Sequence, residues 1–517
     1  MAGKLGAISE TLVVNSMWSW VPICVRLISN NDVHAVSGIQ VKFQHHGTST
    51  SFWLTISPVP VSTLDEYEVY VASGDTIDEQ TVVWIPAKYH LHHSLTKNEN
   101  FRMFLSQFLT NGFSLFPHNS VSSQEPEVSV LALSPKDHAT NTKRFRHGKK
   151  LRFSSATSQA EISITSFPFS FTNPVLFSNF RSHGFINYAY IDNGAPLAYL
   201  TDTRYLENMA GGIVQLTDSS AIGLVIGNLR KRNGDGDLNL VCGWHLLGDY
   251  LTKLFGSDAI SDNSSVLESR TDMIPVFPLV VGNSTSKSWG TCTYVSSVLV
   301  TNYHVLKTYI EAADSSATCT IYVHGSQKIH LSLKDNIITP FPELDLSFIF
   351  LSPHHLASLG KVRDLKPSSS DVNDTVYSVG YGLFYSQRQT APLLAKGHIS
   401  ALSSLPFTMD ESPIKTMIVT SASCWNGSSG GALVDSENKL VGIICSNAQV
   451  RVPEVAGTTT GQTEKLCTFC MCLPIGLVLR CLEACKSLAA PQLNPDIAKL
   501  WTLSTTHKDV IETGPKL

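Results

Sequence analysis

Net charge and long apolar segments are both scarce in this sequence. Its 517 residues include 38 lysines and arginines against 42 aspartates and glutamates, which gives a formal net charge of −4. Without a basic excess the chain lacks the electrostatic footprint of a nucleic-acid-binding protein, so we expect no nucleic-acid partner. No segment reaches the roughly 18 consecutive apolar residues of a transmembrane helix. We therefore also expect no membrane span.

The N-terminal apolar stretch has little of the character of an export signal. The apolar stretch 12–25 follows Glu10, is interrupted by Asn15 and Ser16, and precedes no small-residue cleavage site. This pattern favours a first core strand over a signal peptide.

The cysteine content is low for a disulfide-rich domain, since a chain of this length has only 11 cysteines. Five of them cluster near the C-terminus: Cys467, Cys470, Cys472, Cys481 and Cys485. Such a cluster can bind zinc. Here the alternation of Cys470 and Cys472, followed by the helical stretch 475–486, favours thiols buried in a strand and a helix. We expect no metal and no cofactor.

The sequence consists mainly of short runs rich in β-branched residues, separated by turn residues. The runs 343–351, 375–383 and 439–446 are examples. Strands at this spacing, with few long helical patterns, predict an all-β protein. A chain of this length is too long for one core and predicts several packed units.

The stretch 424–446 carries the strongest chemical signal. Its Gly427-Ser428-Ser429-Gly430-Gly431 run precedes a predicted β-hairpin. A nucleophilic serine needs a tight turn whose backbone N–H groups can hold an oxyanion, and glycines permit such a turn. An ordinary Gly/Ser hairpin loop is the alternative for a G-x-S-G run alone.

This loop and its hairpin resemble the serine loop of the trypsin/chymotrypsin superfamily, and more closely its Deg/HtrA branch. The resemblance implies that Ser429 is the nucleophile and that the N–H groups of Gly427 and Ser429 form the oxyanion hole. Ser428 stands where extracellular trypsins have an aspartate. This departure argues against their zymogen-activation switch.

The same resemblance supplies a base and an acid. His304 lies in VLVTNYHVLK (298–307), which is similar to the T-x-x-H-V pattern of Deg/HtrA proteases. Asp345 opens the apolar run of PELDLSFIFL (342–351) and is similar to the family's D-L-A-[VL]-L element. The order His304, Asp345, Ser429 is that of chymotrypsin, with Glu343 and Asp374 as alternative acids. The implied mechanism is that of a serine endopeptidase.

The resemblance also implies a substrate pocket without charge. In the family, the residue six before the nucleophile forms the base of the pocket, and the second strand of the hairpin forms its wall. These positions are Ser423, Cys445, Ser446 and Asn447. An uncharged pocket disfavours lysine or arginine at the cleaved position and suits a small side chain.

The N-terminal half repeats the pattern in degenerate form. Residues 127–135 match 345–353 at an offset of 218, and residues 208–227 match 427–446 at an offset of 219. Ala210 then takes the position of Ser429, and Glu127 that of Asp345. No histidine occurs within 47–61, where the base belongs. These observations predict a protease-like domain that has lost catalysis.

Together these matches predict tandem chymotrypsin-like double β-barrel domains, the N-terminal one degenerate, with a short C-terminal helix. The expected division has four parts: a degenerate domain over 1–255, a linker over 256–272, an active trypsin-like domain over 273–490, and a tail over 491–517.

The whole chain resembles the peroxisomal (in plants, glyoxysomal) leader-peptide-processing proteases. The last three residues, Pro515-Lys516-Leu517, are similar to the S-K-L peroxisomal address except at Pro515. The resemblance implies removal of targeting peptides from precursors of peroxisomal matrix enzymes, a peroxisomal import receptor as partner, and location in the matrix; a homo-oligomer stays open. A general Deg/HtrA-like quality-control protease and a non-catalytic substrate-binding or chaperone module are the alternatives.

Overall fold

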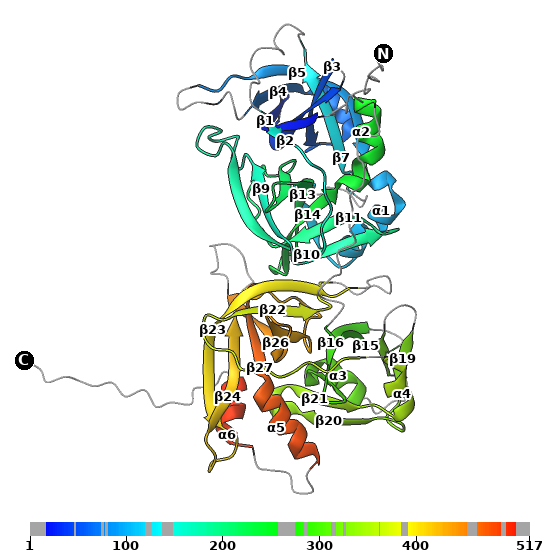
Figure 1. The fold of residues 1–517 in the computed structure, drawn as a ribbon, viewed down its shortest axis with the longest axis vertical. Helices are drawn as coiled ribbons and strands as arrows, with labels where there is room; N and C mark the ends of the chain where they lie inside the picture. Colours follow the sequence, from blue (N-terminus) through cyan, green and yellow to red (C-terminus); the bar gives the residue numbers. More distant parts are fainter. Residues whose placement is uncertain are drawn as a thin grey trace, which may run out of the picture.

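The computed structural model divides into two β-rich halves that follow one another along the chain (Figure 1). It describes residues 17–30, 32–45, 48–73, 77, 81–118, 126–136, 148–256, 274–283, 287–311, 317–323, 327–360, 362–383, 391–451, 463–486 and 493–502. No helix in these ranges is long and apolar enough to span a lipid bilayer.

The first barrel of the N-terminal half closes in the strand order β1-β2-β3-β7-β5-β4, with β4 returning to β1. Its strands are β1 (Met17–Ile28), β2 (Val33–His45), β3 (Thr48–Ile56), β4 (Glu68–Ser73), β5 (Ile85–Ser94) and β7 (Ser129–Pro135), and β8 (Lys149–Lys150) extends β1. Residues 17–25 form the core strand expected there, since Ile23 and Val25 are fully buried. Residues 1–16 lie outside the described ranges.

The second barrel closes in the order β9-β10-β11-β14-β13-β12. Its strands are β9 (Glu161–Ser166), β10 (Phe180–Asp192), β11 (Ala195–Thr201), β12 (Ile213–Leu216), β13 (Ala221–Arg230) and β14 (Gly236–Gly243), with β6 (Ser114–Phe116) added to β13. Two α-helices of this half are α1 (Glu99–Thr110) and α2 (Gly248–Phe255). Buried Trp20, Trp53 and Trp244 belong to one apolar core that joins both barrels.

The C-terminal half pairs an open sheet with a closed barrel. The sheet runs β19-β18-β15-β16-β17-β21-β20, and the barrel closes as β22-β23-β24-β27-β26-β25. The sheet strands are β15 (Val276–Gly282), β16 (Lys287–Val295), β17 (Val298–Thr301), β18 (Thr318–Tyr322), β19 (Lys328–Leu331), β20 (Ile337–Phe341) and β21 (Leu346–Phe350). The barrel strands are β22 (Thr375–Gly380), β23 (Leu393–Pro406), β24 (Pro413–Thr420), β25 (Ala432–Asp435), β26 (Leu440–Arg451) and β27 (Thr463–Pro474).

The described residues of the C-terminal half include the α-helices α3 (Tyr303–Ile310), α4 (Pro353–Ser358), α5 (Ile475–Lys486) and α6 (Pro495–Trp501). The clustered cysteines lie in β27 and α5, where Cys470, Cys472 and Cys481 are buried. No group of three or more metal-ligating side chains occurs within the described residues.

The two halves share one strand order, although the first sheet of the C-terminal half remains open, so the fold is a tandem of chymotrypsin-like double β-barrel domains. The second barrels have the same strand order, with β9 equivalent to β22 and β12 equivalent to β25. The hydrogen bonds of their loops also correspond. Gly211 N–H donates to the Val225 carbonyl at 2.7 Å, and Gly430 N–H, 219 residues later, donates to the Ile444 carbonyl at 2.8 Å.

A comparison of the first β-sheets of the two halves corrects one detail of the internal alignment. Ser57 N–H donates to the Ser129 carbonyl, as Tyr303 N–H donates to the Asp345 carbonyl. The equivalent of Asp345 is therefore Ser129, and the expected equivalent, Glu127, lies two residues too early. The same register places Pro58 at the position of His304. A proline side chain has no proton-accepting atom, and Ala210 is fully buried at the position of Ser429, so these two positions of the N-terminal half supply neither a base nor a nucleophile.

The segment boundaries can be compared with the structure only in part. The expected linker 256–272 lies outside the described ranges except for Gly256, which follows the last residue of α2. Helix α6 lies within the expected tail 491–517, yet Ile497 is fully buried in the core of the C-terminal half. Trp501 Nε1 donates to the Thr416 carbonyl at 3.1 Å. The tripeptide 515–517 lies outside the described residues.

Candidate functional site

His304 and Asp345 form a hydrogen-bonded pair in the C-terminal half. His304 stands in the first turn of α3, directly after β17 and Asn302. Its Nδ1 lies 2.6 Å from Asp345 Oδ2, and its backbone N–H donates to Asp345 Oδ1 at 2.8 Å. One carboxylate thus fixes both the ring and the backbone of the histidine. This arrangement leaves Nε2 as the ring nitrogen available to accept a proton.

The backbone of Asp345 is also fixed by its conformation and by a hydrogen bond. Asp345 follows the 3₁₀-helix η6 (Pro342–Leu344) and has a left-handed φ of 51°, a conformation that aspartate tolerates better than most residues. Buried Asn302 donates through Nδ2 to the Asp345 carbonyl at 2.9 Å. The acid that reaches His304 is therefore Asp345. Of the two alternatives, Glu343 is exposed in η6, and Asp374 accepts from Asp371 N–H.

Ser429 lies on the loop before β25 and is half-buried. Its Oγ donates to the Cys445 carbonyl at 3.1 Å, and no hydrogen bond joins it to His304, although the structure describes both residues. Its carbonyl accepts from Thr291 N–H of β16 at 2.8 Å. Asn302 Nδ2 lies 3.2 Å from Cys445 Sγ. Asn302 and Cys445 thus link the His304–Asp345 pair to the Ser429 loop.

Two backbone donors of this loop are unused by the chain. Within the described residues, the N–H groups of Gly427 and Ser429 donate to no protein atom. Their neighbours are fixed, since Ser428 N–H donates to the Trp425 carbonyl at 2.9 Å and Thr291 Oγ1 donates to the Gly427 carbonyl at 2.8 Å. Free, pre-positioned N–H groups beside a serine can stabilise an oxyanion.

Ser428, at the position of the trypsin aspartate, is buried and uncharged. Its Oγ accepts from Trp425 N–H at 3.2 Å, which closes the loop on itself. Ser428 therefore stabilises the loop through a hydrogen bond within the loop.

The expected pocket residues differ in their burial and in their hydrogen bonds. Ser423 is buried, and its carbonyl accepts from Ser378 Oγ at 2.5 Å. Cys445 contributes its carbonyl to Ser429, while its buried thiol faces Asn302; burial raises the pKa of this thiol. Ser446 is exposed, and Asn447 Nδ2 lies 3.4 Å from the Cys424 carbonyl. None carries a charge, and the Cys445 side chain lies in the core of the C-terminal half.

Sequence reasoning missed two supporting residues. Thr291 Oγ1 donates to the Gly427 carbonyl at 2.8 Å and accepts from Tyr381 N–H at 2.9 Å. Asn302, two residues before His304, holds the Asp345 backbone. The position of Asn302 beside the histidine is a usable signal. Thr291 gives no such signal, because it acts on a loop 136 residues away.

Residues 290–443, under a third of the chain, match the family model described as trypsin-like peptidase domain. No curated protein matches the chain. Similar solved structures include the HtrA-type protease AlgW with tripeptide (19% identity, 41% of this chain and 60% of that one, TM-score 0.27). Another is the serine endoprotease from Yersinia pestis, with 16% identity over 42% of this chain and 66% of that one and a TM-score of 0.28. A third is the Rv3671c protease from M. tuberculosis in its active form, with 19% identity over 44% of this chain and 96% of that one and a TM-score of 0.27.

The chain therefore spans 60% of the length of AlgW. At these low identities and TM-scores, the support for a serine peptidase comes from the family match and from the site geometry of this chain.

Proposed function

We propose that the chain is a serine endopeptidase with Ser429 as nucleophile, His304 as general base and Asp345 as the acid that orients the imidazole. The observation that carries the proposal is the pairing of His304 Nδ1 with Asp345 beside a serine loop with two unused N–H groups. The match of residues 290–443 to the trypsin-like peptidase model supports it.

In the proposed reaction, Ser429 Oγ forms a bond to the peptide carbonyl carbon while its proton passes to His304 Nε2. The hydroxyl must leave the Cys445 carbonyl for this step, and substrate binding often tightens such contacts. The N–H groups of Gly427 and Ser429 hold the oxyanion. Collapse breaks the C–N bond, and His304 gives its proton to the leaving amine. Water, deprotonated by His304, then hydrolyses the acyl-enzyme.

We further propose that the substrates are precursors of peroxisomal matrix enzymes, from which the enzyme removes targeting peptides in the peroxisomal matrix. The resemblance of the whole chain to leader-peptide-processing proteases supports this, and an uncharged Ser423 is compatible with it. An import receptor would be the delivery partner. The general Deg/HtrA-like protease shares every catalytic feature and differs only in its substrates.

The test is cleavage of a peroxisomal enzyme precursor by the purified chain and by Ser429→Ala, together with labelling by a serine-reactive fluorophosphonate. We expect wild type to be labelled and to trim the presequence, and Ser429→Ala to lose both by several orders of magnitude. Digestion of an unfolded model protein without trimming of the precursor would favour the general protease. A folded wild type that is neither labelled nor active would favour a non-catalytic binding module.

A further inference from the structure

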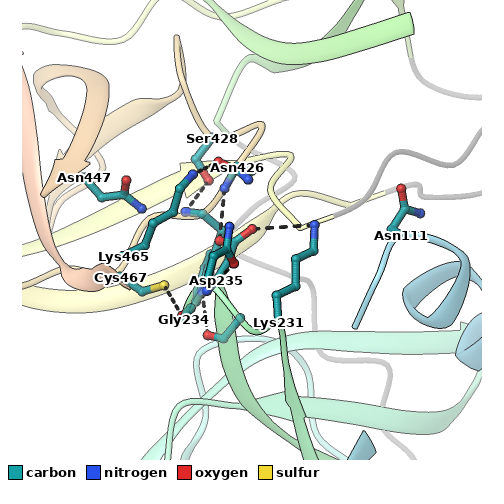
Figure 2. Close-up of polar contacts among 12 residues, drawn as sticks. Asn111, Lys231, Gly234, Asp235, Asn426, Ser428, Asn447, Lys465 and Cys467 are labelled. Atoms are coloured by element: carbon teal, nitrogen blue, oxygen red, sulfur yellow. Dashed lines mark hydrogen bonds and ion pairs between the residues drawn. The ribbon is translucent and has the colours of Figure 1, made fainter. Parts of the chain in front are cut away.

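The inactive half contacts the serine loop of the other half directly. The turn between β13 and β14, residues 231–236, lies against β27 and against the chain just before Ser429 (Figure 2). Lys465 N–H of β27 donates to the Asn233 carbonyl at 2.8 Å. Cys467 Sγ donates to the Gly234 carbonyl at 3.4 Å. The turn is therefore joined to a strand of the catalytic barrel by hydrogen bonds.

Close approach at this contact depends on Gly234. Its φ is +82°, and a Cβ atom there would lie 2.6 Å from Glu464 Cγ and 2.9 Å from the Lys465 carbonyl oxygen. Any larger residue would push the turn away from β27. Arg230 and Glu464 form an ion pair across the same contact.

Trp425, two residues before Gly427, places its side chain in the other half. It is 4% exposed and packs in the apolar core that joins the N-terminal barrels. Its indole Nε1 donates to the Gly236 carbonyl at 3.0 Å. The backbone carbonyl of the same residue accepts from Ser428 N–H. The inactive half therefore holds a residue on which the shape of the serine loop depends.

Asp235 lies at the centre of the contact with no exposed surface. Its Oδ1 is 3.5 Å from Asn426 N–H, and its Oδ2 is 3.9 Å from Lys231 Nζ. Lys465 Nζ donates to the Asn426 side chain from the opposite side, as Figure 2 shows. Burial raises the pKa of the Asp235 carboxyl, while Lys465 and Lys231 act to lower it. A buried carboxylate is costly unless it is paired, and the contacts of Asp235 reach both halves: Lys231 of its own half and the backbone of Asn426 in the other.

We propose that Asp235 and the 231–236 turn are positioning elements for the oxyanion loop. They hold Trp425 and Asn426 so that the N–H groups of Gly427 and Ser429 remain aimed at the reacting carbonyl. Ser428 supplies no charge within the loop, and the inactive half supplies an acid beside it. The N-terminal half thus takes part in catalysis by the other half. This inference rests on the proposed serine-peptidase function.

The test compares Asp235→Ala, Asp235→Asn and the control Asp202→Asn in the full chain. Asp202 is a half-buried aspartate of the same half, and its carboxylate accepts from Phe185 N–H and Asn187 Nδ2. Asn187 Nδ2 also donates to the Leu394 carbonyl of β23 at 2.9 Å, so this control lies at a contact between the halves that does not involve the serine loop. Kinetics on a peptide substrate, the rate of fluorophosphonate labelling and the melting temperature are measured for each variant.

Because a small misplacement of catalytic donors is costly, we expect Asp235→Ala to lower kcat and the labelling rate by about 10- to 100-fold, with KM changed less than about twofold. Asp235→Asn keeps an acceptor for Asn426 and should restore kcat to within about threefold of wild type. Asp202→Asn should affect only the melting temperature.

A wild-type kcat in Asp235→Ala would overturn the inference while leaving the proposed function intact. If Asp235→Ala does not fold, Trp425→Phe removes the bond to the Gly236 carbonyl and replaces the buried indole with a smaller ring. A normal kcat in that variant would overturn the inference instead. A folded wild type that is neither labelled nor active would overturn the proposed function, and this inference with it.

Discussion

Gly427→Ala is expected to abolish most of the activity of a chain that still folds. Gly427 has a φ of +94°, and a Cβ atom at this position would lie 2.0 Å from Trp289 Nε1 and 2.6 Å from the Tyr381 carbonyl oxygen. Neither neighbour can easily retreat, because Trp289 Nε1 donates to that same carbonyl at 3.1 Å. The loop must therefore move, and with it the N–H of residue 427.

The size of the effect follows from the donor that is displaced. Loss of one oxyanion-hole donor typically lowers kcat by about 10²- to 10³-fold, with little effect on KM. Left-handed backbone adds about 1–2 kcal/mol of strain for alanine. We expect both effects in Gly427→Ala, measured as steady-state kinetics on a peptide substrate and as unfolding in urea.

Gly194→Ala is the matched control. Gly194 has a φ of +80° in the turn between β10 and β11, and a Cβ atom there would meet nothing within 4 Å. Gly194→Ala should lower the free energy of unfolding through the same backbone strain, but it should keep the wild-type kcat. If Gly427→Ala kept a wild-type kcat, or if Gly194→Ala lost as much activity, the assignment of the oxyanion hole would be wrong.

Two further predictions concern side chains with defined partners. Asp345→Asn places an amide against His304 Nδ1, favours the wrong tautomer, and should lower kcat by about 10³- to 10⁴-fold at an unchanged melting temperature; more than a tenth of wild-type kcat would contradict this. Burial lowers the pKa of His118 to about 4, so the stability from its neutral ring is complete above pH 6.5 and is lost as the pH falls toward 4. Between pH 7 and 4.5, wild type should lose about 2 kcal/mol more unfolding free energy in urea than His118→Gln does. Equal losses in the two proteins would refute this role.

Local patterns were sufficient to predict the fold class and the pair of candidate site residues that the structure brings together, His304 and Asp345. The Gly427–Gly431 run before a hairpin, and His304 directly after a β-branched strand, occupy short continuous segments. Turn geometry and strand burial constrain the residue types in such segments. The structure places His304 against Asp345, as the order of the motifs suggested.

The internal alignment failed where its only guide was hydrophobic alternation. Matching 127–135 to 345–353 placed Glu127 on Asp345, two residues from the equivalent that the hydrogen bonds identify, Ser129. Side chains in a strand alternate with a period of two, so a shift by two keeps each apolar residue on the same face. Composition cannot separate two such registers, whereas the hydrogen bond from Ser57 to Ser129 does.

By itself, the sequence therefore determined two β-rich halves with one repeated pattern, alanine in place of the loop serine in the first half, and a serine loop preceded by a histidine and an aspartate in the second. The tertiary structure decided which groups of the two halves meet. Asn426 and Asp235 are 191 residues apart, and Trp425 and Gly236 are 189 apart. No local propensity encodes such a pair, because it depends on how two independently closed barrels pack against one another. That packing places an acid of the inactive half beside the serine loop of the other.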